Sequence, residues 1–177
     1  MIAESQYWKD PLLEMAERLV SLKTIGDLSE GKLVQIERDV FIGFYSVRKL
    51  FEAIAKVTDA TKAMKVHFVS HPNRQFVTWP NSHKFDELYD FSVSKEEYRD
   101  VVFVCGRIIH SFIFCPCVDE HGLAGIIFTS DTDRQSRIYY MDIDEVINIF
   151  ERVGSDYPSD IRWEKDDGTG KEITIVK

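Results

Sequence analysis

The sequence has few of the residues and motifs that mark disordered, disulfide-stabilised or nucleotide-binding proteins. Its 177 residues include only 5 prolines, 9 glycines and 3 cysteines. It contains no Walker loop, dinucleotide-binding fingerprint, nucleophile elbow or His-Glu-x-x-His motif. With 44% hydrophobic residues, this composition is typical of a compact chain rather than a disordered one. We therefore expect a single globular domain over residues 1–177, whose core needs no disulfides.

The cysteine count and the first thirty residues indicate a cytoplasmic protein. Three cysteines are an odd number, so we expect reduced thiols. Charged residues such as Glu4, Lys9 and Asp10 interrupt any apolar stretch of a signal peptide. The apolar run Val101–Val118 has the length of a membrane span, but Arg107 near its centre would cost about 2.5–3.5 kcal/mol in a bilayer. The sequence therefore predicts no membrane segment.

Positive charge is scarce in the second half of the chain. The formal net charge is −8, and residues 94–177 contribute −7 of it, with 10 lysines and arginines against 17 aspartates and glutamates. Nucleic-acid binding needs clustered lysines and arginines, so we expect no nucleic-acid partner. An acidic surface is compatible with a protein partner of basic character. The alternative is that the carboxylates only keep the protein in solution.

The first third of the chain has the periodicity of two helices. Asp10 and Pro11 fit an N-cap and a first helical residue, and apolar residues then follow at helical spacing until Val20. A second apolar stripe runs from Leu33 to Ile54, and its one weak position is Gly43. Two helices joined by a short connection predict an antiparallel pair.

The remaining chain alternates between short strands and helices. Capping-box spacings predict helices near residues 95–106 and 143–153. Apolar and β-branched runs bounded by turn residues predict strands. These are Lys65–Ser70 with a return strand Gln75–Trp79, a strand ending at Cys117, then Leu123–Thr129 and Arg137–Met141, and a terminal hairpin of Ile161–Glu164 and Glu172–Val176. The fold class is therefore α+β, with the N-terminal antiparallel helix pair packed on a mostly antiparallel sheet.

The apolar run Val101–Val118 and the turn after it contain the candidate site residues. Cys115, Cys117 and His121 are soft ligands that zinc accepts, but zinc sites normally separate paired cysteines by two to four residues. We therefore expect no bound metal, with the three residues as the alternative. Arg107 and His110 are the ionisable residues of the run, and a buried charge must be paired or functional. They are the candidate catalytic residues. The structural alternative is that Arg107 crosses the end of a helix and His110 hydrogen-bonds within the core.

Two functions follow from these observations. The first is a small acidic interaction or regulatory module with no catalytic activity and no cofactor, which binds a protein partner through its acidic C-terminal half. It predicts an exposed acidic face and no deep polar pocket. The alternative is an enzyme or metal-binding protein whose site is formed by Arg107, His110, Cys115, Cys117 and His121. It predicts that these side chains converge on one accessible cleft.

Overall fold

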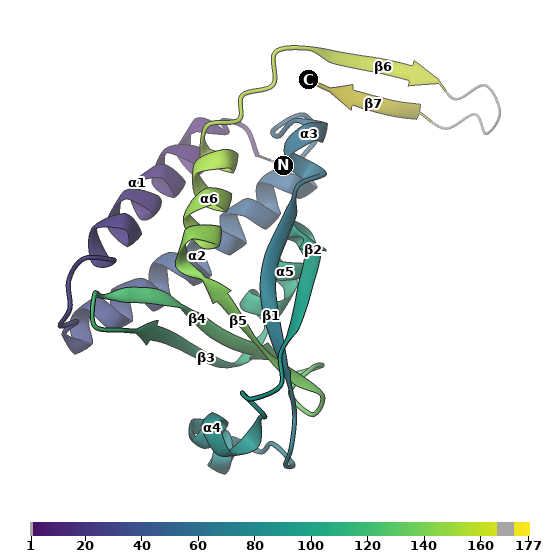
Figure 1. Cartoon of the computed structure of the whole chain (residues 1–177). Helices are drawn as coiled ribbons and strands as arrows, with labels where there is room; N and C mark the ends of the chain where they lie inside the picture. The colour runs from purple at the N-terminus through teal and green to yellow at the C-terminus, as the bar shows by residue number, and fades with distance from the viewer. Residues whose placement is uncertain (1, 166–171) are drawn as a thin grey trace.

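The computed structural model describes residues 2–165 and 172–177 and has the α+β architecture expected from the sequence (Figure 1). Residues 167–170, where the predicted terminal hairpin turns, lie outside the described residues. The helices are α1 (Gln6–Leu22), α2 (Glu30–Glu52), α3 (Asp59–Lys62), the 3-10 helix η1 (Trp79–Lys84), α4 (Phe85–Leu88), α5 (Val101–Ile109) and α6 (Ile143–Gly154). The strands are β1 (Lys65–Pro72), β2 (Lys95–Asp100), β3 (Ser111–Val118), β4 (Leu123–Ser130), β5 (Arg137–Asp142), β6 (Ile161–Lys165) and β7 (Glu172–Val176). In the described part of the chain, no helix is both long and apolar enough to cross a bilayer.

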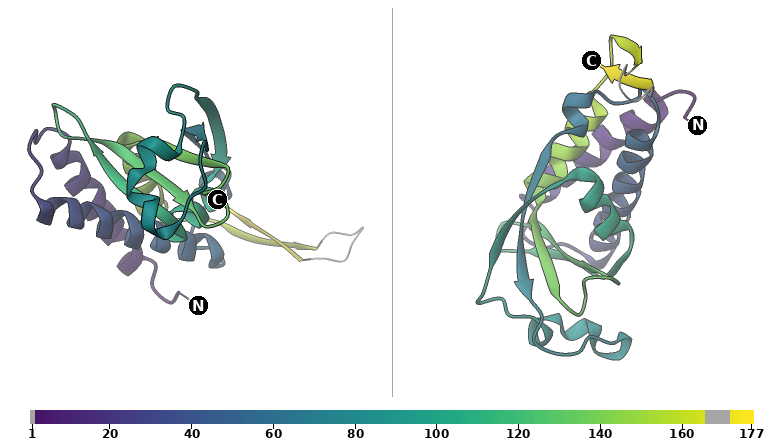
Figure 2. Two further views of the ribbon diagram at one scale, coloured as in Figure 1. Left: turned by 90° about the horizontal axis from the view of Figure 1, so that it is seen from below. Right: turned by 90° about the vertical axis from the view of Figure 1, so that its right-hand side faces the viewer.

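Five strands form one antiparallel sheet in the order β2-β1-β5-β4-β3. Helices α1, α2, α5 and α6 gather on one side of this sheet and share its core, as the two views of Figure 2 show. The edge strands carry residues that discourage pairing with other chains: β2 is rich in charged side chains, and β3 contains Pro116. The sheet therefore has an inner face under the helices and an outer face away from them.

A buried carboxylate joins the two N-terminal helices. Asp39 of α2 accepts two hydrogen bonds of 2.9 Å from the guanidinium of Arg18 in α1, through Nε and Nη2. Gln35 donates a third, at 2.8 Å, to the same carboxylate. Such bidentate pairing satisfies both oxygens and fixes the relative position of the helices. The predicted antiparallel helix pair is confirmed.

Helix α6 packs so closely on the helix pair that a glycine is needed at the contact. A Cβ atom at Gly43 of α2 would lie 2.2 Å from an atom of the Phe150 ring in α6. The Phe150 ring also packs edge-on against the Phe44 ring, with 5.3 Å between the two ring centres. A Cβ atom at Gly154, the last residue of α6, would lie 2.7 Å from the side chain of Leu13 in α1. The glycine that weakens α2 as an isolated helix is therefore what lets α6 approach.

Helix α1 begins earlier than the sequence predicts. It starts at Gln6, so Pro11 lies inside the helix rather than at its first position. Contacts with the far end of the chain hold the added turn, because the buried Nζ of Lys9 donates to the Asp156 carbonyl oxygen and lies 4.2 Å from the centre of the Tyr157 ring. These contacts are absent from the local sequence pattern, which is why the Asp-Pro signal was misleading.

The prediction of a helix from Lys95 is wrong for its first six residues. Residues Lys95–Asp100 form strand β2, and α5 starts at Val101 with Asp100 as its N-cap, whose carboxylate accepts the Phe103 N–H at 2.7 Å. The inward side chain Glu97 is buried and paired with Arg137, so this strand shows no apolar alternation. The predicted helix at 143–153 is confirmed as α6.

The predicted return strand Gln75–Trp79 is absent, and β1 pairs instead with β2 and β5. Residues 73–93 fold as a separate segment that includes η1 and α4. The side chain of Gln135 satisfies the backbone of Val77, accepting from its N–H at 3.0 Å and donating to its carbonyl at 2.6 Å. Leu88 and Tyr89 of this segment form a second small core with Ile113 and Ile138. The segment thus covers one end of the outer sheet face.

Strands β6 and β7 confirm the predicted terminal hairpin, which projects from the body of the molecule (Figure 1). Its base is held by backbone hydrogen bonds between Asp160 and Lys177. The side chain of Asp59 in α3 also accepts the Val176 N–H at 3.0 Å. All five residues of β6 are exposed.

Replacing Gly43 by alanine is expected to destabilise the protein, although alanine is favoured over glycine in a helix by about 1 kcal/mol. The added methyl group would overlap the Phe150 ring. Gly31→Ala is the matched control, because Gly31 also lies in α2 but a Cβ atom there meets nothing within 4 Å. Urea denaturation should show a lower unfolding free energy for Gly43→Ala and an unchanged or higher one for Gly31→Ala. Equal stability of the two variants would contradict the close packing.

Candidate interaction surface

The outer face of the sheet is only half covered. One row of paired residues crosses all five strands and points away from the helices: Cys115, Ile127, Tyr140, Val69 and Glu96. The neighbouring row contains Cys117, Gly125 and Asp142. We call these eight residues, together with His67 of β1, the outer sheet surface.

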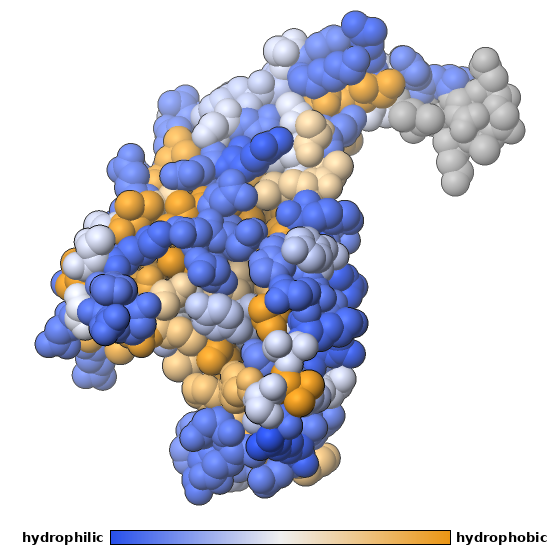
Figure 3. All heavy atoms as spheres, viewed as in Figure 1, coloured by the Kyte–Doolittle hydropathy of each residue, from blue (hydrophilic) through white to orange (hydrophobic). Residues whose placement is uncertain are grey.

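This surface has an apolar centre that the helices and the 73–93 segment leave accessible. The side chains of Cys115, Cys117, Val69 and Tyr140 are half-buried, whereas the inner-face neighbours of Val69 and Tyr140, such as Phe68 and Tyr139, are buried. Figure 3 shows hydrophobic side chains gathered between the β3–β4 hairpin and the α4 segment, with hydrophilic ones around them. Sheets of this kind normally place polar residues on an exposed face, so the apolar strip makes this face a candidate contact surface.

Carboxylates border the apolar centre. Burial raises the pKa of the Tyr140 hydroxyl, and the nearby charges of Asp142, Cys117 and Asp119 raise it further. Glu96 lies beside His67 on the opposite side of the face. Asp119, Asp142 and Glu96 therefore form a negative rim around a neutral strip, and Glu145 extends this rim at the start of α6.

A hollow of about 350 Å³ lies where this rim meets the start of α6. Asp142 caps α6 by accepting the Asp144 N–H at 2.8 Å, as the sequence predicts, and Asp144 pairs with Lys23. Within the described residues, Asp142 and Glu145 have no ion-pair partner. The side chains around the hollow are those of His67, Val69, Tyr140, Asp142, Asp144 and Glu145. A hollow of this chemistry suits the cationic end of a lysine or arginine side chain.

The cysteines and His121 do not form a common site. Cys115 and Cys117 share the outer face of β3, whereas His121 is exposed in the turn after β3 and lies 3.4 Å from Glu120. Among residues 2–165 and 172–177, no group of three or more histidine, cysteine, aspartate or glutamate side chains is placed to hold a metal ion. Burial raises the pKa of the Cys117 thiol to about 12, with a further contribution from Cys115, so this side chain is a neutral thiol in the metal-free protein.

Arg107 crosses from the last turn of α5 to the loop between β4 and β5. Its Nε lies 2.5 Å from Asp133 Oδ2, although its N–H is not aligned for a hydrogen bond. The same carboxylate oxygen accepts hydrogen bonds from Tyr139 at 2.9 Å and from Ser130 at 3.3 Å. The guanidinium also lies 4.6 Å from the centre of the Phe103 ring. A cation at the end of a helix is favourable, so these contacts fit a structural ion pair.

His110 is the C-cap of α5 and is exposed, so it does not hydrogen-bond within the core. It lies with Arg107 at a cleft of about 440 Å³ that Ser130 and Thr132 also line. The structure thus brings two of the five candidate site residues to one cleft and leaves Cys115, Cys117 and His121 elsewhere. Asp133, in the loop between β4 and β5, is the central acceptor of this ion pair.

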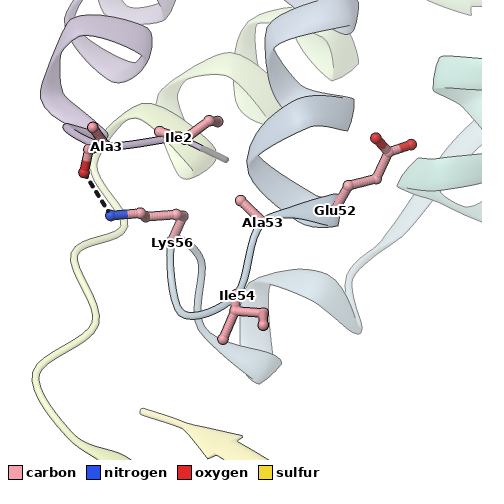
Figure 4. Close-up of a pocket in the computed structure, with 6 residues that line it drawn as sticks. All are labelled: Ile2, Ala3, Glu52, Ala53, Ile54 and Lys56. Atoms are coloured by element: carbon pink, nitrogen blue, oxygen red, sulfur yellow. Dashed lines mark hydrogen bonds between the residues drawn. The ribbon is translucent and has the colours of Figure 1, made fainter.

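A cavity of about 520 Å³ lies away from all these residues, between the N-terminal segment and the end of α2 (Figure 4). Its polar groups are already engaged: the Lys56 Nζ donates to the Ala3 carbonyl oxygen at 2.9 Å. Arg48 and Lys49 bind Glu52 and hold the pKa of that carboxyl below its usual range. We assign no site there.

No family model, curated protein or solved structure matches this chain. The chemistry of the outer sheet surface must therefore be judged from its own residues. The spacing of Cys115 and Cys117 in the predicted strand that ends at Cys117 puts both on one face, but no sequence pattern singled out Val69 and Tyr140. Strand alternation alone gives the orientation of these residues within each strand, but it does not say which face the helices cover.

The three thiols are expected to react slowly with iodoacetamide in the folded protein. Burial raises the pKa of Cys105 and Cys117 to about 12 and also raises that of Cys115. At pH 8 a thiol with such a pKa is only about 0.01% thiolate, which is the nucleophilic form. Labelling should accelerate with rising pH, with Cys115 first, and mass spectrometry of denatured protein should show all three thiols modified. Rapid labelling of Cys117 at pH 8 would contradict this and indicate a stabilised thiolate.

Proposed function

We propose that this chain is a single-domain, non-catalytic interaction module that uses its outer sheet surface to bind a basic segment of a protein partner. One observation carries the proposal: an accessible apolar strip across the sheet is bordered by carboxylates, of which Asp142 and Glu145 have no ion-pair partner in the described part of the chain. Apolar contact would supply affinity, and the rim would select a partner with lysine or arginine beside its apolar residues.

The charge of the chain supports the same choice. Asp119, Asp142 and Glu145 all belong to the C-terminal half, which carries −7 of the formal charge of −8. A surface of this sign repels phosphate backbones, so the partner is a protein rather than RNA or DNA. The reduced state expected of the cysteines fits action in the cytoplasm.

Replacement of rim and strip residues is expected to weaken partner binding. The variants are Glu145→Lys, which reverses one rim charge, and Val69→Lys, which places a charge in the apolar strip. Affinity capture from the native host should recover a partner with the wild-type chain but much less of it with either variant. With the isolated partner, Glu145→Lys should slow association severalfold, because attraction between opposite charges speeds encounter. Binding should also weaken with added salt, since exposed charges are screened beyond about 8 Å at 0.15 M.

Glu151→Lys is the matched control, because it reverses an exposed charge on the same helix as Glu145 but lies outside the surface. Thermal melting should confirm that all three variants remain folded. Asp133 is unsuitable for charge reversal, because it holds Arg107. Unchanged capture by Glu145→Lys and Val69→Lys, or capture that depends on nucleic acid, would refute the proposal.

A second candidate function is the binding of a small polar ligand in the cleft of Arg107 and His110. The supporting observation is the cleft itself, which combines a guanidinium, an imidazole and the Ser130 and Thr132 hydroxyls. Under this alternative, native mass spectrometry of protein from its host should show a bound small molecule that His110→Ala loses. His121→Ala, which removes an exposed imidazole elsewhere, should retain it. Wild-type protein without any adduct would rule this candidate out.

A further inference from the structure

The terminal hairpin exposes a strand edge that no described part of the chain covers. Strand β6 pairs with β7 along one edge, and β7 lies between β6 and the body of the molecule (Figure 1). The contact of Asp59 with the Val176 N–H occupies the other edge of β7. The outer edge of β6 therefore faces solvent, on a surface distinct from the outer sheet surface.

The hydrogen bonds at the hairpin base establish which groups point outward. Asp160 and Lys177 exchange both backbone hydrogen bonds, each 2.9 Å long. In an antiparallel pair these exchanges recur at every second residue, so Arg162 and Glu164 direct their backbone groups toward β7. The N–H and C=O groups of Ile161, Trp163 and Lys165 consequently point to the free edge.

The sequence of this edge is complementary to itself when read in the opposite direction. If two copies of β6 run antiparallel with Trp163 opposite its own counterpart, Arg162 lies opposite Glu164 of the other copy, and Glu164 lies opposite Arg162. Trp163 and its counterpart become a hydrogen-bonded pair, as do Ile161 and Lys165. The two oppositely charged pairs fall at the positions between hydrogen bonds, where side chains approach most closely.

Exposure of apolar side chains on this hairpin points to the same arrangement. Trp163 is 64% exposed and Ile161 is 45% exposed on one face of β6. An isolated two-stranded hairpin is marginally stable in water, and pairing with a third and fourth strand would stabilise it. Charges on an edge strand usually prevent such pairing. Here, however, Arg162 and Glu164 are spaced so that each would lie opposite the other in a second copy.

We infer that two copies of this chain associate by antiparallel pairing of β6 with β6, forming a four-stranded sheet centred on Trp163. The symmetry is two-fold, so both copies use the same surface. Each β6 is about 17 Å long and leaves its own body in the opposite direction to its counterpart, which places the two bodies at opposite ends of the shared sheet. The interface is small, so association depends on concentration.

Charge reversal at the two paired positions tests this arrangement by analytical ultracentrifugation of the full chain. Wild-type protein should show a concentration-dependent dimer. Arg162→Glu and Glu164→Arg should each weaken it by about tenfold or more, because each variant places two like-charged pairs across the dimer. An equimolar mixture of the two variants should restore association, since every cross-strand pair then joins opposite charges. The double variant Arg162→Glu, Glu164→Arg should likewise dimerise.

Three controls separate this geometry from general electrostatics and from misfolding. Arg152→Glu and Glu151→Arg reverse exposed charges on α6 and should leave the dimer unchanged. Asp160→Asn removes the 2.8 Å pair that Asp160 makes with Arg162 within one chain, and it should also retain the dimer. Circular dichroism should give the same fold for every variant. A monomer at all concentrations, a dimer indifferent to both single reversals, or a mixture that associates no better than its components would overturn the inference.

Discussion

The contact between the Phe150 ring and the backbone of Gly43 is the constraint on which the rest of the fold depends. It joins the N-terminal helix pair to α6, and α6 is covalently continuous with β5 at the centre of the sheet. Gly154 repeats this close approach on α1. Protein interiors are closely packed. The short distances from α6 to α1 and α2 therefore also set the positions of these helices over the inner face of the sheet. The helices consequently occupy one side of the sheet and leave the other available.

The availability of that outer face explains why the polar residues of the Val101–Val118 region have different roles. Arg107 lies under the helical side and is held by Asp133, so its charge is neutralised within the fold. Cys115 and Cys117 lie on the outer side, where burial beside Tyr140 suppresses their ionisation. The 73–93 segment covers only one end of this face. What remains is an apolar strip with a carboxylate border, on which the proposed interaction rests.

Local patterns predicted elements well where one face is apolar and the capping residues are nearby. Strands β3, β4 and β5 and helix α6 follow alternation or helical spacing that needs no distant partner. The pattern failed at β2, since its buried Glu97 is satisfied by Arg137, which is 40 residues away. It failed again at the start of α1, where Lys9 depends on Asp156. In both places a polar or charged side chain is buried by a contact that the local sequence does not contain.

The sequence by itself determined the α+β class, the helix pair, the acidic C-terminal half and the shared face of Cys115 and Cys117, because each depends on spacing or composition alone. Only the tertiary structure decided which sheet face is covered, which charged residues are paired, and that the candidate residues divide between a cleft, a sheet face and a turn. The physical reason is that burial and ion pairing are properties of residues brought together from distant positions. Periodicity orients a side chain relative to its own element, whereas packing determines what that side chain meets.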